Sequence, residues 1–185
     1  KTNPLALPPA DAPGDTAALL DEIAWNLIEQ SPSTATGLGI DTGDHAYLRS
    51  RMGDTSPTGI ARMAAVAESD LASVRALDRS GLDPATLTSL DVIESAYATA
   101  LEGFALPYGD VAVGGWRNTP YVVIQNTGAY LDVPRFLDSD HPVKTKEDAE
   151  AYLARLGQFP AILDGELERM RSATALGVIA PAFLL

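Results

Sequence analysis

The chain has 185 residues without cysteine, and its 13 basic against 25 acidic side chains give a net charge of −12. This length and a hydrophobic content of 46% suit one domain with a sizeable core and exclude a disordered acidic chain. The negative charge argues against nucleic acid or an anionic membrane as a partner, and the lack of cysteine excludes disulfides, thiolate metal sites and thiol catalysis.

Both ends of the chain differ from the rest. Residues 1–14 (KTNPLALPPADAPG) contain four prolines, which restrict the backbone, so we expect an extended proline-rich arm. Such an arm fits a mature exported protein or a cloned fragment. The other end, Phe183-Leu184-Leu185, is apolar where chain ends are usually polar, and it predicts that the domain over 15–185 is truncated from a longer protein. No apolar stretch is long enough to span a bilayer.

The first helix is predicted over residues 15–30. Apolar side chains recur there at helical spacing, namely at Leu20, Ile23, Ala24, Leu27 and Ile28. Ser31-Pro32 pairs a capping residue with proline at the first helical position and predicts a second helix directly afterwards. Three glycines between Gly37 and Gly43 then indicate a loop.

Two long helices are predicted next, and each begins with a capping residue followed by proline. Ser56-Pro57 opens a helix that runs to about Ser80, where Gly81 is expected to form a left-handed cap. Asp83-Pro84 opens another helix, which ends near Phe104. Apolar residues keep the helical period through both, so each helix is expected to bury one face.

Residues 107–144 interrupt this pattern with eight glycines and prolines. Tyr121 to Ile124 has the composition of a strand, but Thr119-Pro120 is a helix-start signal, and we predict a short helix there. A single helical turn is also expected at Asp132. This segment forms the irregular centre of the sequence.

The last long helix is predicted to begin at Thr145, which has capping-box spacing to Asp148, and to end at Gly177. Pro160 is expected to bend or break it. Its predicted buried face consists of Ala149, Tyr152, Leu153, Leu156, Phe159, Leu163, Leu167 and Met170. The elements together predict an all-α fold, a bundle-like array of long helices with an irregular Gly/Pro-rich central segment.

Few residues are arranged for catalysis. The two histidines, His45 and His141, are far apart, and no HExxH motif is present. Asp138, Asp140 and His141 form an oxygen-rich loop, but without the glycine and distal glutamate of a calcium loop it is better explained as a polar loop. Nucleophile elbows and phosphate loops are also missing. We therefore predict no catalytic residue and no metal ligand in this chain.

Carboxylates are too common here to mark a site alone. Glu94 and Glu102 lie two helical turns apart and could serve a carboxylate-pair hydrolase, but 25 acids supply many such pairs by chance. Residues 138–168 hold eight acids against three bases. We interpret this excess as the exposed acidic face of the last helix and its entry.

The candidate substrate-binding residues are aromatic and amide side chains clustered in the irregular segment. They are Trp116, Asn118, Tyr121, Gln125, Asn126 and Tyr130. Amides can pair with a peptide backbone, and aromatic rings can cover a ligand. An alternative is equally physical, because a glycine-rich crossover needs side-chain amides to satisfy its own backbone.

Four stretches resemble, in order, the N-terminal half of a bacterial family, the domain-of-unknown-function family 885. They are Ser31 to Gly39 (SPSTATGLG), Pro120 to Pro142, Asp148 to Leu156 (DAEAYLARL) and Gly177 to Leu184 (GVIAPAFL). The resemblance covers about residues 16 to 185. No single motif is diagnostic, but the four together are fairly specific.

The resemblance implies an N-terminal scaffold or substrate-cleft domain of a zinc-dependent peptidase-like protein. Members resemble helical zincin-type metallopeptidases, are considerably longer than this chain, and carry an HExxH-like motif in a C-terminal part that is missing here. Zinc is therefore expected in that missing C-terminal catalytic region, which would be the main partner, with a peptide-like substrate and no activity for this fragment alone. Many relatives are exported or lipoprotein-like, which implies a periplasmic or secreted location.

A second hypothesis needs no missing part. The chain would then be a complete, non-enzymatic helical binding module whose acidic face meets a basic partner or peptide. If the chain is instead truncated, an apolar surface is left exposed, and we expect self-association through residues 178–185 and the long helices.

Overall fold

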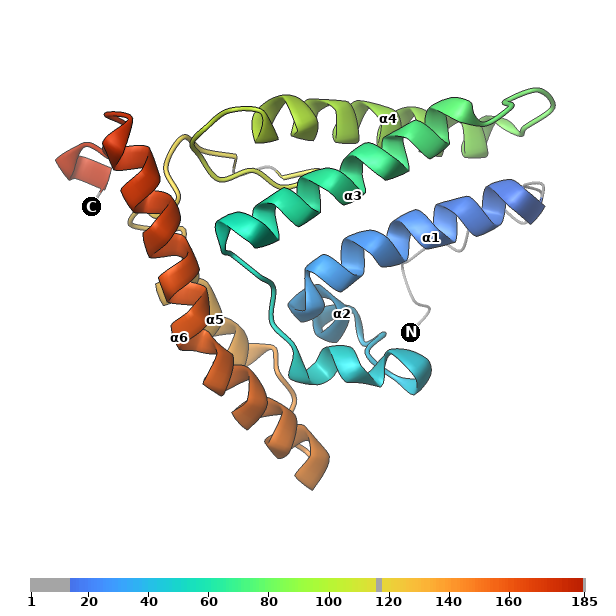
Figure 1. Cartoon of the computed structure of the whole chain (residues 1–185). Coiled ribbons are helices and arrows are strands. Elements are labelled where there is room, and N and C mark those ends of the chain that lie inside the picture. Colours follow the sequence, from blue (N-terminus) through green and yellow to red (C-terminus); the bar gives the residue numbers. More distant parts are fainter. Residues whose placement is uncertain (1–13, 116–117, 185) are drawn as a thin grey trace.

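A computed structural model describes residues 14–115 and 118–184 of the chain. These residues form helices and no strand, so the predicted all-α fold is confirmed. The predicted proline-rich arm lies outside the described residues except for Gly14, which begins the first helix. The helices form two groups that meet at an angle (Figure 1).

The first group is a layer of three long helices (Figure 1): α1 (Gly14–Gln30), α3 (Pro57–Ala76) and α4 (Pro84–Phe104). Helices α3 and α4 run antiparallel, and the Asp83 carboxylate caps α4 by accepting the N–H groups of Ala85 and Thr86. The layer closes over one apolar core, which contains Ile23, Ala67, Leu71, Val74, Leu82, Leu90 and Tyr97.

The end of α3 differs from its prediction. The helix stops at Ala76, not near Ser80, and Leu77 already has extended backbone angles. Gly81 does adopt the expected left-handed conformation, with φ of 78°, but it does so within the loop that leads to α4. A positive φ is needed equally in turns and in helix caps, so the glycine signal alone could not separate the two.

Two short elements lie beneath α1 (Figure 1). Helix α2 (Pro32–Leu38) ends at Gly39, whose φ of 70° makes the left-handed cap. The 3-10 helix η1 (Gly43–Ser50) follows and places Leu48 in the interior. Together they form the surface against which the second group of helices packs.

The second group consists of α5 (Ala129–Ser139) and α6 (Lys146–Ala175), followed by the short 3-10 helix η2 (Ala182–Leu184). Both ends of α6 agree with the sequence: Thr145 and Asp148 form a capping box, and Gly177, with φ of 80°, closes the other end. The helix continues across Pro160 without a break. Its apolar contacts with α5 hold both sides of the proline, through Phe159 and Ile162.

The predicted buried face of α6 is wrong in part. Leu153, Leu156, Leu163 and Leu167 lie in solvent, with 65, 43, 38 and 40% of their surface exposed. The face turned inward instead includes Asp148, Arg155 and Glu166. A pattern argument that places only apolar residues inside cannot detect a core face built partly from charged side chains.

The irregular segment also departs from its prediction. The stretch after Thr119-Pro120 is irregular rather than helical. It follows a small bridge in which the N–H of Asp110 donates to the carbonyl of Thr119 at 2.8 Å and the N–H of Thr119 donates to the carbonyl of Asp110 at 3.2 Å. A second small bridge joins Ile124 to Thr127. The single turn expected at Asp132 is part of α5, which is 11 residues long.

One arginine joins the two groups of helices. Arg155 of α6 is fully buried, and its guanidinium donates to the carbonyl oxygens of Arg51 at 2.9 Å, Leu48 at 3.0 Å and Pro32 at 3.3 Å. It also donates to the Thr36 hydroxyl at 2.8 Å. All these partners belong to α2, η1 or the turn after η1, so Arg155 satisfies a set of buried carbonyls that no apolar side chain could.

A second arginine ties the capping box to the same interface. Arg49 forms ion pairs with Asp41 at 3.3 Å and with Asp148 at 2.8 Å. Asp148 also accepts the backbone N–H groups of Lys144 and Thr145. These backbone bonds, chiefly that of Lys144, lower the pKa of Asp148 despite its burial, and Arg49 adds to the effect.

Candidate functional site

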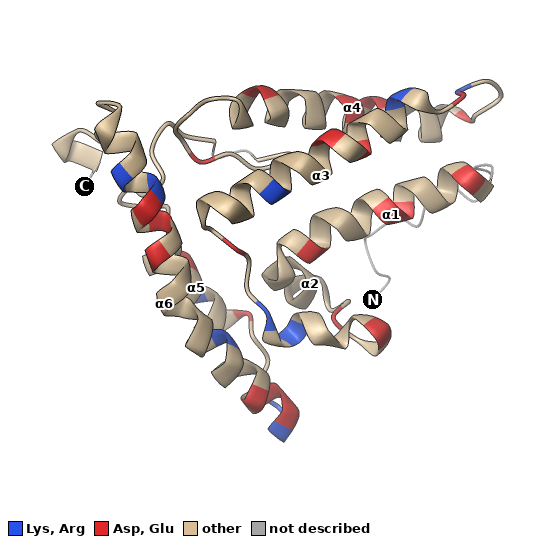
Figure 2. Cartoon of the chain, in the orientation of Figure 1, with Lys and Arg blue, Asp and Glu red and all other residues tan. Residues whose placement is uncertain are grey.

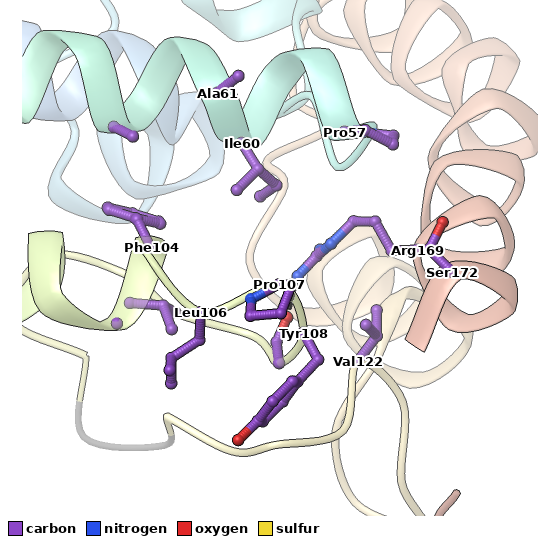
Figure 3. A pocket seen from close by; sticks show the side chains of 14 residues that line it. Pro57, Ile60, Ala61, Phe104, Leu106, Pro107, Tyr108, Val122, Arg169 and Ser172 are labelled. Carbon is purple, nitrogen blue, oxygen red and sulfur yellow. Dashed lines mark hydrogen bonds between the residues drawn. The ribbon is translucent and has the colours of Figure 1, made fainter. Parts of the chain in front are cut away.

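A cavity of about 300 Å³ lies where α3, the end of α4 and α6 converge (Figure 3). The irregular segment runs directly past it. The lining is mostly apolar, with Pro57, Ile60, Ala61 and Ala64 from α3, Gly103 and Phe104 from α4, Leu106, Pro107, Tyr108, Gly109, Val111 and Val122 from the irregular segment, and Arg169 and Ser172 from α6. A cavity of this size is at the lower end of those that hold small ligands.

Close backbone packing positions the walls of the cavity. At Gly165 of α6, a Cβ atom would lie 2.7 Å from the backbone nitrogen of Ser56, so only glycine lets α6 approach the start of α3 this closely. The Thr55 hydroxyl fixes the approach by donating to the carbonyl of Ile162 at 2.7 Å. At Gly109, φ is 100° and a Cβ atom would lie 2.9 Å from the carbonyl oxygen of Thr119.

The polar groups of the lining are few. The Arg169 guanidinium donates to the carbonyl of Gly109 at 2.9 Å and pairs with the Asp110 carboxylate at 2.5 Å. Its charge is therefore compensated within the wall, and it holds the irregular segment against α6. Tyr108 lies at the edge of the cavity with its hydroxyl away from the helices (Figure 3). The arrangement suits an apolar group flanked by neutral polar atoms.

Next to this wall, a buried carboxylate caps α5. Both oxygens of Glu166 accept the N–H of Ala129, at 2.9 and 3.1 Å, and the side chain is buried. Burial raises the pKa of Glu166, and the nearby carboxylates of Asp110 and Asp132 add to that increase. The Ala129 N–H and the Arg169 guanidinium oppose it, and the first turn of α5 further favours the negative charge.

The sequence candidates are spread over the irregular segment rather than gathered at one point. Trp116 lies outside the described residues. Asn118 lies beside a groove along α4, and its side-chain oxygen accepts the N–H of Ala112 at 3.2 Å. Tyr121 lines a separate cavity of about 160 Å³ between the irregular stretch after Pro120 and the end of α6.

The remaining candidates meet at the turn before α5. The Tyr130 hydroxyl lies 2.7 Å from the carbonyl oxygen of Gln125 and donates a hydrogen bond there. The Gln125 N–H in turn donates to the carbonyl of Leu184 at 2.9 Å, and the Asn126 side chain contacts Thr127. Asn118 and Tyr130 thus satisfy backbone groups of the crossover itself, as the alternative interpretation of this cluster expects, while Asn118 and Tyr121 still border open space.

The cavity-lining residues Ile60, Tyr108, Arg169 and Ser172 were not among the sequence candidates. They come from two helices, α3 and α6, and a loop, and each has an ordinary local pattern. The one usable signal is Pro107-Tyr108-Gly109, which predicts a sharp turn at the end of α4. Without the pairing of α6 with α3, however, nothing in the sequence shows what this turn faces.

The described residues do not fit a zinc site. His141 is buried, its Nε2 lies 3.0 Å from the carbonyl of Asp148 and its Nδ1 lies 2.9 Å from the Arg155 guanidinium, so both ring nitrogens are engaged. His45 stacks on Trp25 with ring centroids 3.4 Å apart. Within residues 14–115 and 118–184, no three His, Asp or Glu side chains gather as a metal ion requires.

The expected acidic face of the last helix needs correction. Asp148 and Glu166 are buried, so this face is reduced to two separate groups along α6 (Figure 2). Glu94, one member of the carboxylate pair considered above, forms ion pairs through both of its oxygens, with Arg75 at 3.0 Å and Arg79 at 2.7 Å.

Fold and cavity together define an all-α unit with an apolar cavity beside an irregular crossover. The chain belongs to a family described as "Bacterial protein of unknown function (DUF885)", whose model matches residues 32–185. It is also similar in fold to a solved "putative lipoprotein" from Colwellia psychrerythraea, with a TM-score of 0.79 and 22% identity. The likeness covers 92% of this chain and 29% of that one, so this chain spans less than a third of the relative's length.

No curated protein matches the chain. Among the described residues, no helix is both long enough and apolar enough to cross a membrane.

Proposed function

We propose that this chain is the substrate-cleft unit of a longer, zinc-dependent peptidase-like protein, in which it contributes one wall and no metal ligand. The observation that carries the proposal is the apolar cavity of about 300 Å³ beside the irregular segment. The family membership, and a structural relative more than three times as long, support a larger protein around this unit.

The chemistry of the wall indicates the class of ligand. Ile60, Phe104 and Leu106 can bury an apolar side chain, and burial of such a group contributes about 1.5–3 kcal/mol. Arg169 is already paired with Asp110, so the described residues that line the cavity offer no uncompensated charge to attract an ionic substrate. Tyr108 and the amide of Asn118 lie on the neighbouring segment and can pair with a peptide backbone.

The first test is binding by the chain itself. The probes are blocked pentapeptides, Gly-Gly-X-Gly-Gly, in which X is Leu, Phe, Asp or Lys, and calorimetry measures their affinity. We expect weak, saturable binding for Leu and Phe, since only apolar side chains match the cavity. Ala64→Phe adds bulk to the α3 wall of the cavity, one helical turn from Ile60, and is expected to abolish this binding.

Ala72→Phe is the matched control, because Ala72 is also an alanine of α3 but does not line the cavity. Equal loss in both variants, or binding of only the Lys peptide, would contradict the proposal. The latter result would favour the alternative of a non-enzymatic module that uses its remaining acidic groups.

The metal content provides an independent test. We expect purified chain to contain no stoichiometric zinc and to cleave none of the peptides, since the proposal places the metal in sequence beyond this unit. One tight zinc per chain, measured by mass spectrometry after dialysis, would refute that part of the proposal.

We also propose a periplasmic or secreted location for the parent protein. The support is the description of the structural relative as a "putative lipoprotein" and the proline-rich sequence of residues 1–14. Fractionation of cells that express the natural gene tests this, and recovery of the protein only in the cytoplasm would contradict it.

A further inference from the structure

His141 lies buried at the joint between the two groups of helices. It follows α5, only 5% of its surface is exposed, and its backbone N–H donates to the carbonyl of Phe136 at 2.9 Å. Its ring packs edge-on against the rings of Phe136 and Tyr152. Because the ring has so little contact with solvent, its nitrogen atoms depend on protein groups for their hydrogen bonds.

The hydrogen bonds of this ring fix where its proton lies. The Arg155 guanidinium lies 2.9 Å from Nδ1, and since a guanidinium can only donate, Nδ1 must be a bare acceptor. Nε2 lies 3.0 Å from the carbonyl oxygen of Asp148, which can only accept, so Nε2 carries the hydrogen. The ring is therefore neutral, and each of its nitrogen atoms is already engaged.

A proton on Nδ1 is incompatible with this arrangement. It would turn the acceptor into a donor that faces the donor of Arg155, and it would place two cations 2.9 Å apart. The carboxylates of Asp41 and Asp148 belong to the same network, but both already pair with Arg49. Proton uptake by His141 and its hydrogen bond with Arg155 therefore exclude each other.

The other groups that face the ring leave this conflict unrelieved. Helix α5 contacts the ring through the apolar side chain of Phe136, and α6 adds the ring of Tyr152. The charged groups nearest in sequence are exposed to solvent, namely Asp138, Asp140 and Lys144. Among the described residues, the contact with Arg155 therefore decides which form of the ring fits.

We propose that His141 is a pH-sensitive latch, which holds the two groups of helices together while its ring is neutral. Histidine changes its charge between about pH 5 and pH 8. A proton on the ring would disturb Arg155, whose other partners lie in α2, in η1 and in the turn after η1. Mild acid then loosens the contact of α6 with α2 and η1. Neither His141 nor Arg155 lines the cavity, so the latch is independent of the proposed function.

The first test compares the wild type with His141→Asn, which keeps an acceptor for Arg155 but cannot titrate. The histidines of an unfolded chain take up protons around pH 6.5, so the folding equilibrium constant of the wild type is expected to fall about tenfold relative to the variant between pH 7.5 and pH 5.5. Urea unfolding measures both proteins. An equal change in both would overturn the proposal.

The control is His45→Asn, which removes the only other histidine and is expected to keep the wild-type decrease. Buried carboxyl groups do not imitate the effect. Burial raises the pKa of Asp70 and Glu166, and groups with a raised pKa stabilise the fold as the pH falls. A decrease that disappears in His45→Asn and persists in His141→Asn would overturn the proposal.

Nitrogen-15 chemical shifts of the ring test the latch in the wild type, so this test does not depend on the folding of a variant. At pH 8 we expect a bare Nδ1 and a protonated Nε2 at His141. The opposite tautomer, or a charged ring at that pH, would overturn the proposal.

Spin labels can report the opening directly, because the chain has no cysteine to remove. Labels at Ala46→Cys of η1 and Ala154→Cys of α6, both exposed, span the joint. Their distances are expected to become longer and more broadly distributed at pH 5.5 than at pH 7.5. A pair at Ala72→Cys and Val92→Cys lies within the first group and should not change. Unchanged distances across the joint, or equal broadening of both pairs, would overturn the proposal.

Discussion

Arg155 shows how a single side chain can determine where two groups of helices meet. Its N–H groups donate hydrogen bonds to the carbonyl oxygens of Pro32, Leu48 and Arg51, which would otherwise be buried without partners. Burial lowers the pKa of Arg155 to about 10, while the charge of Asp41 opposes that shift, so the guanidinium stays charged at neutral pH. The adjacent His141 accepts from it and donates to Asp148, and this geometry requires the neutral ring.

Arg155→Met is therefore expected to destabilise the fold by about 3 kcal/mol or more, because each orphaned buried acceptor costs about 1–3 kcal/mol. Urea unfolding followed by circular dichroism measures the change. Arg135→Met, at an exposed position, serves as control and is expected to stay within about 0.5 kcal/mol of the wild type. If Arg155→Met leaves the free energy of unfolding unchanged, the carbonyl groups must find other donors.

Asp148 makes the same interface sensitive to acid. Its pKa is lowered in the folded chain, so its stabilising effect is complete above the ordinary carboxyl pKa of about 4 and is lost as the pH falls through the folded value. The wild type should lose more stability than Asp148→Asn between about pH 6 and pH 3. If the urea midpoints of the two proteins change by the same amount across that range, this role of Asp148 would be contradicted.

At the scale of elements, helix starts could be predicted because their signals are local. Asp83-Pro84 and Thr145 each begin helices as expected, since a cap needs only residues within one turn. The non-helical course of the chain after Pro120 could not be predicted, because it follows a bridge between Thr119 and Asp110, nine residues earlier in the sequence. The cavity could not be predicted from the sequence either, since it depends on the close approach of Gly165 to Ser56.

Two Ser-Pro pairs look alike in sequence but differ in the structure. Ser56 accepts the N–H of Gly59 at 3.1 Å, whereas Ser31 makes no cap bond to the backbone. Ser56→Ala is therefore expected to cost about 1 kcal/mol and Ser31→Ala less than about 0.5 kcal/mol. Chemical denaturation of both variants makes the comparison, and an equal cost would show that the cap bond is not what separates them.

At the scale of the whole molecule, charged residues inside and leucines outside define α6. Its inner face carries Arg155 and Glu166 and joins the two groups of helices, while its side chains Arg169 and Ser172 complete the cavity. Its outer face exposes Leu153, Leu156, Leu163 and Leu167 among the described residues. One helix thus links the fold and the candidate binding site, which explains why an apolar-inside pattern described it only in part.

The central claim is that the cavity between α3, α4 and α6 binds an apolar side chain. Titration of labelled chain with the Gly-Gly-Leu-Gly-Gly peptide, followed by amide chemical shifts in NMR spectra, tests it most directly. We predict saturable shifts at Ala61, Gly103, Tyr108, Val122 and Ser172, which line the cavity. Absence of saturable shifts, or shifts confined to the acidic start of α6, would contradict the claim.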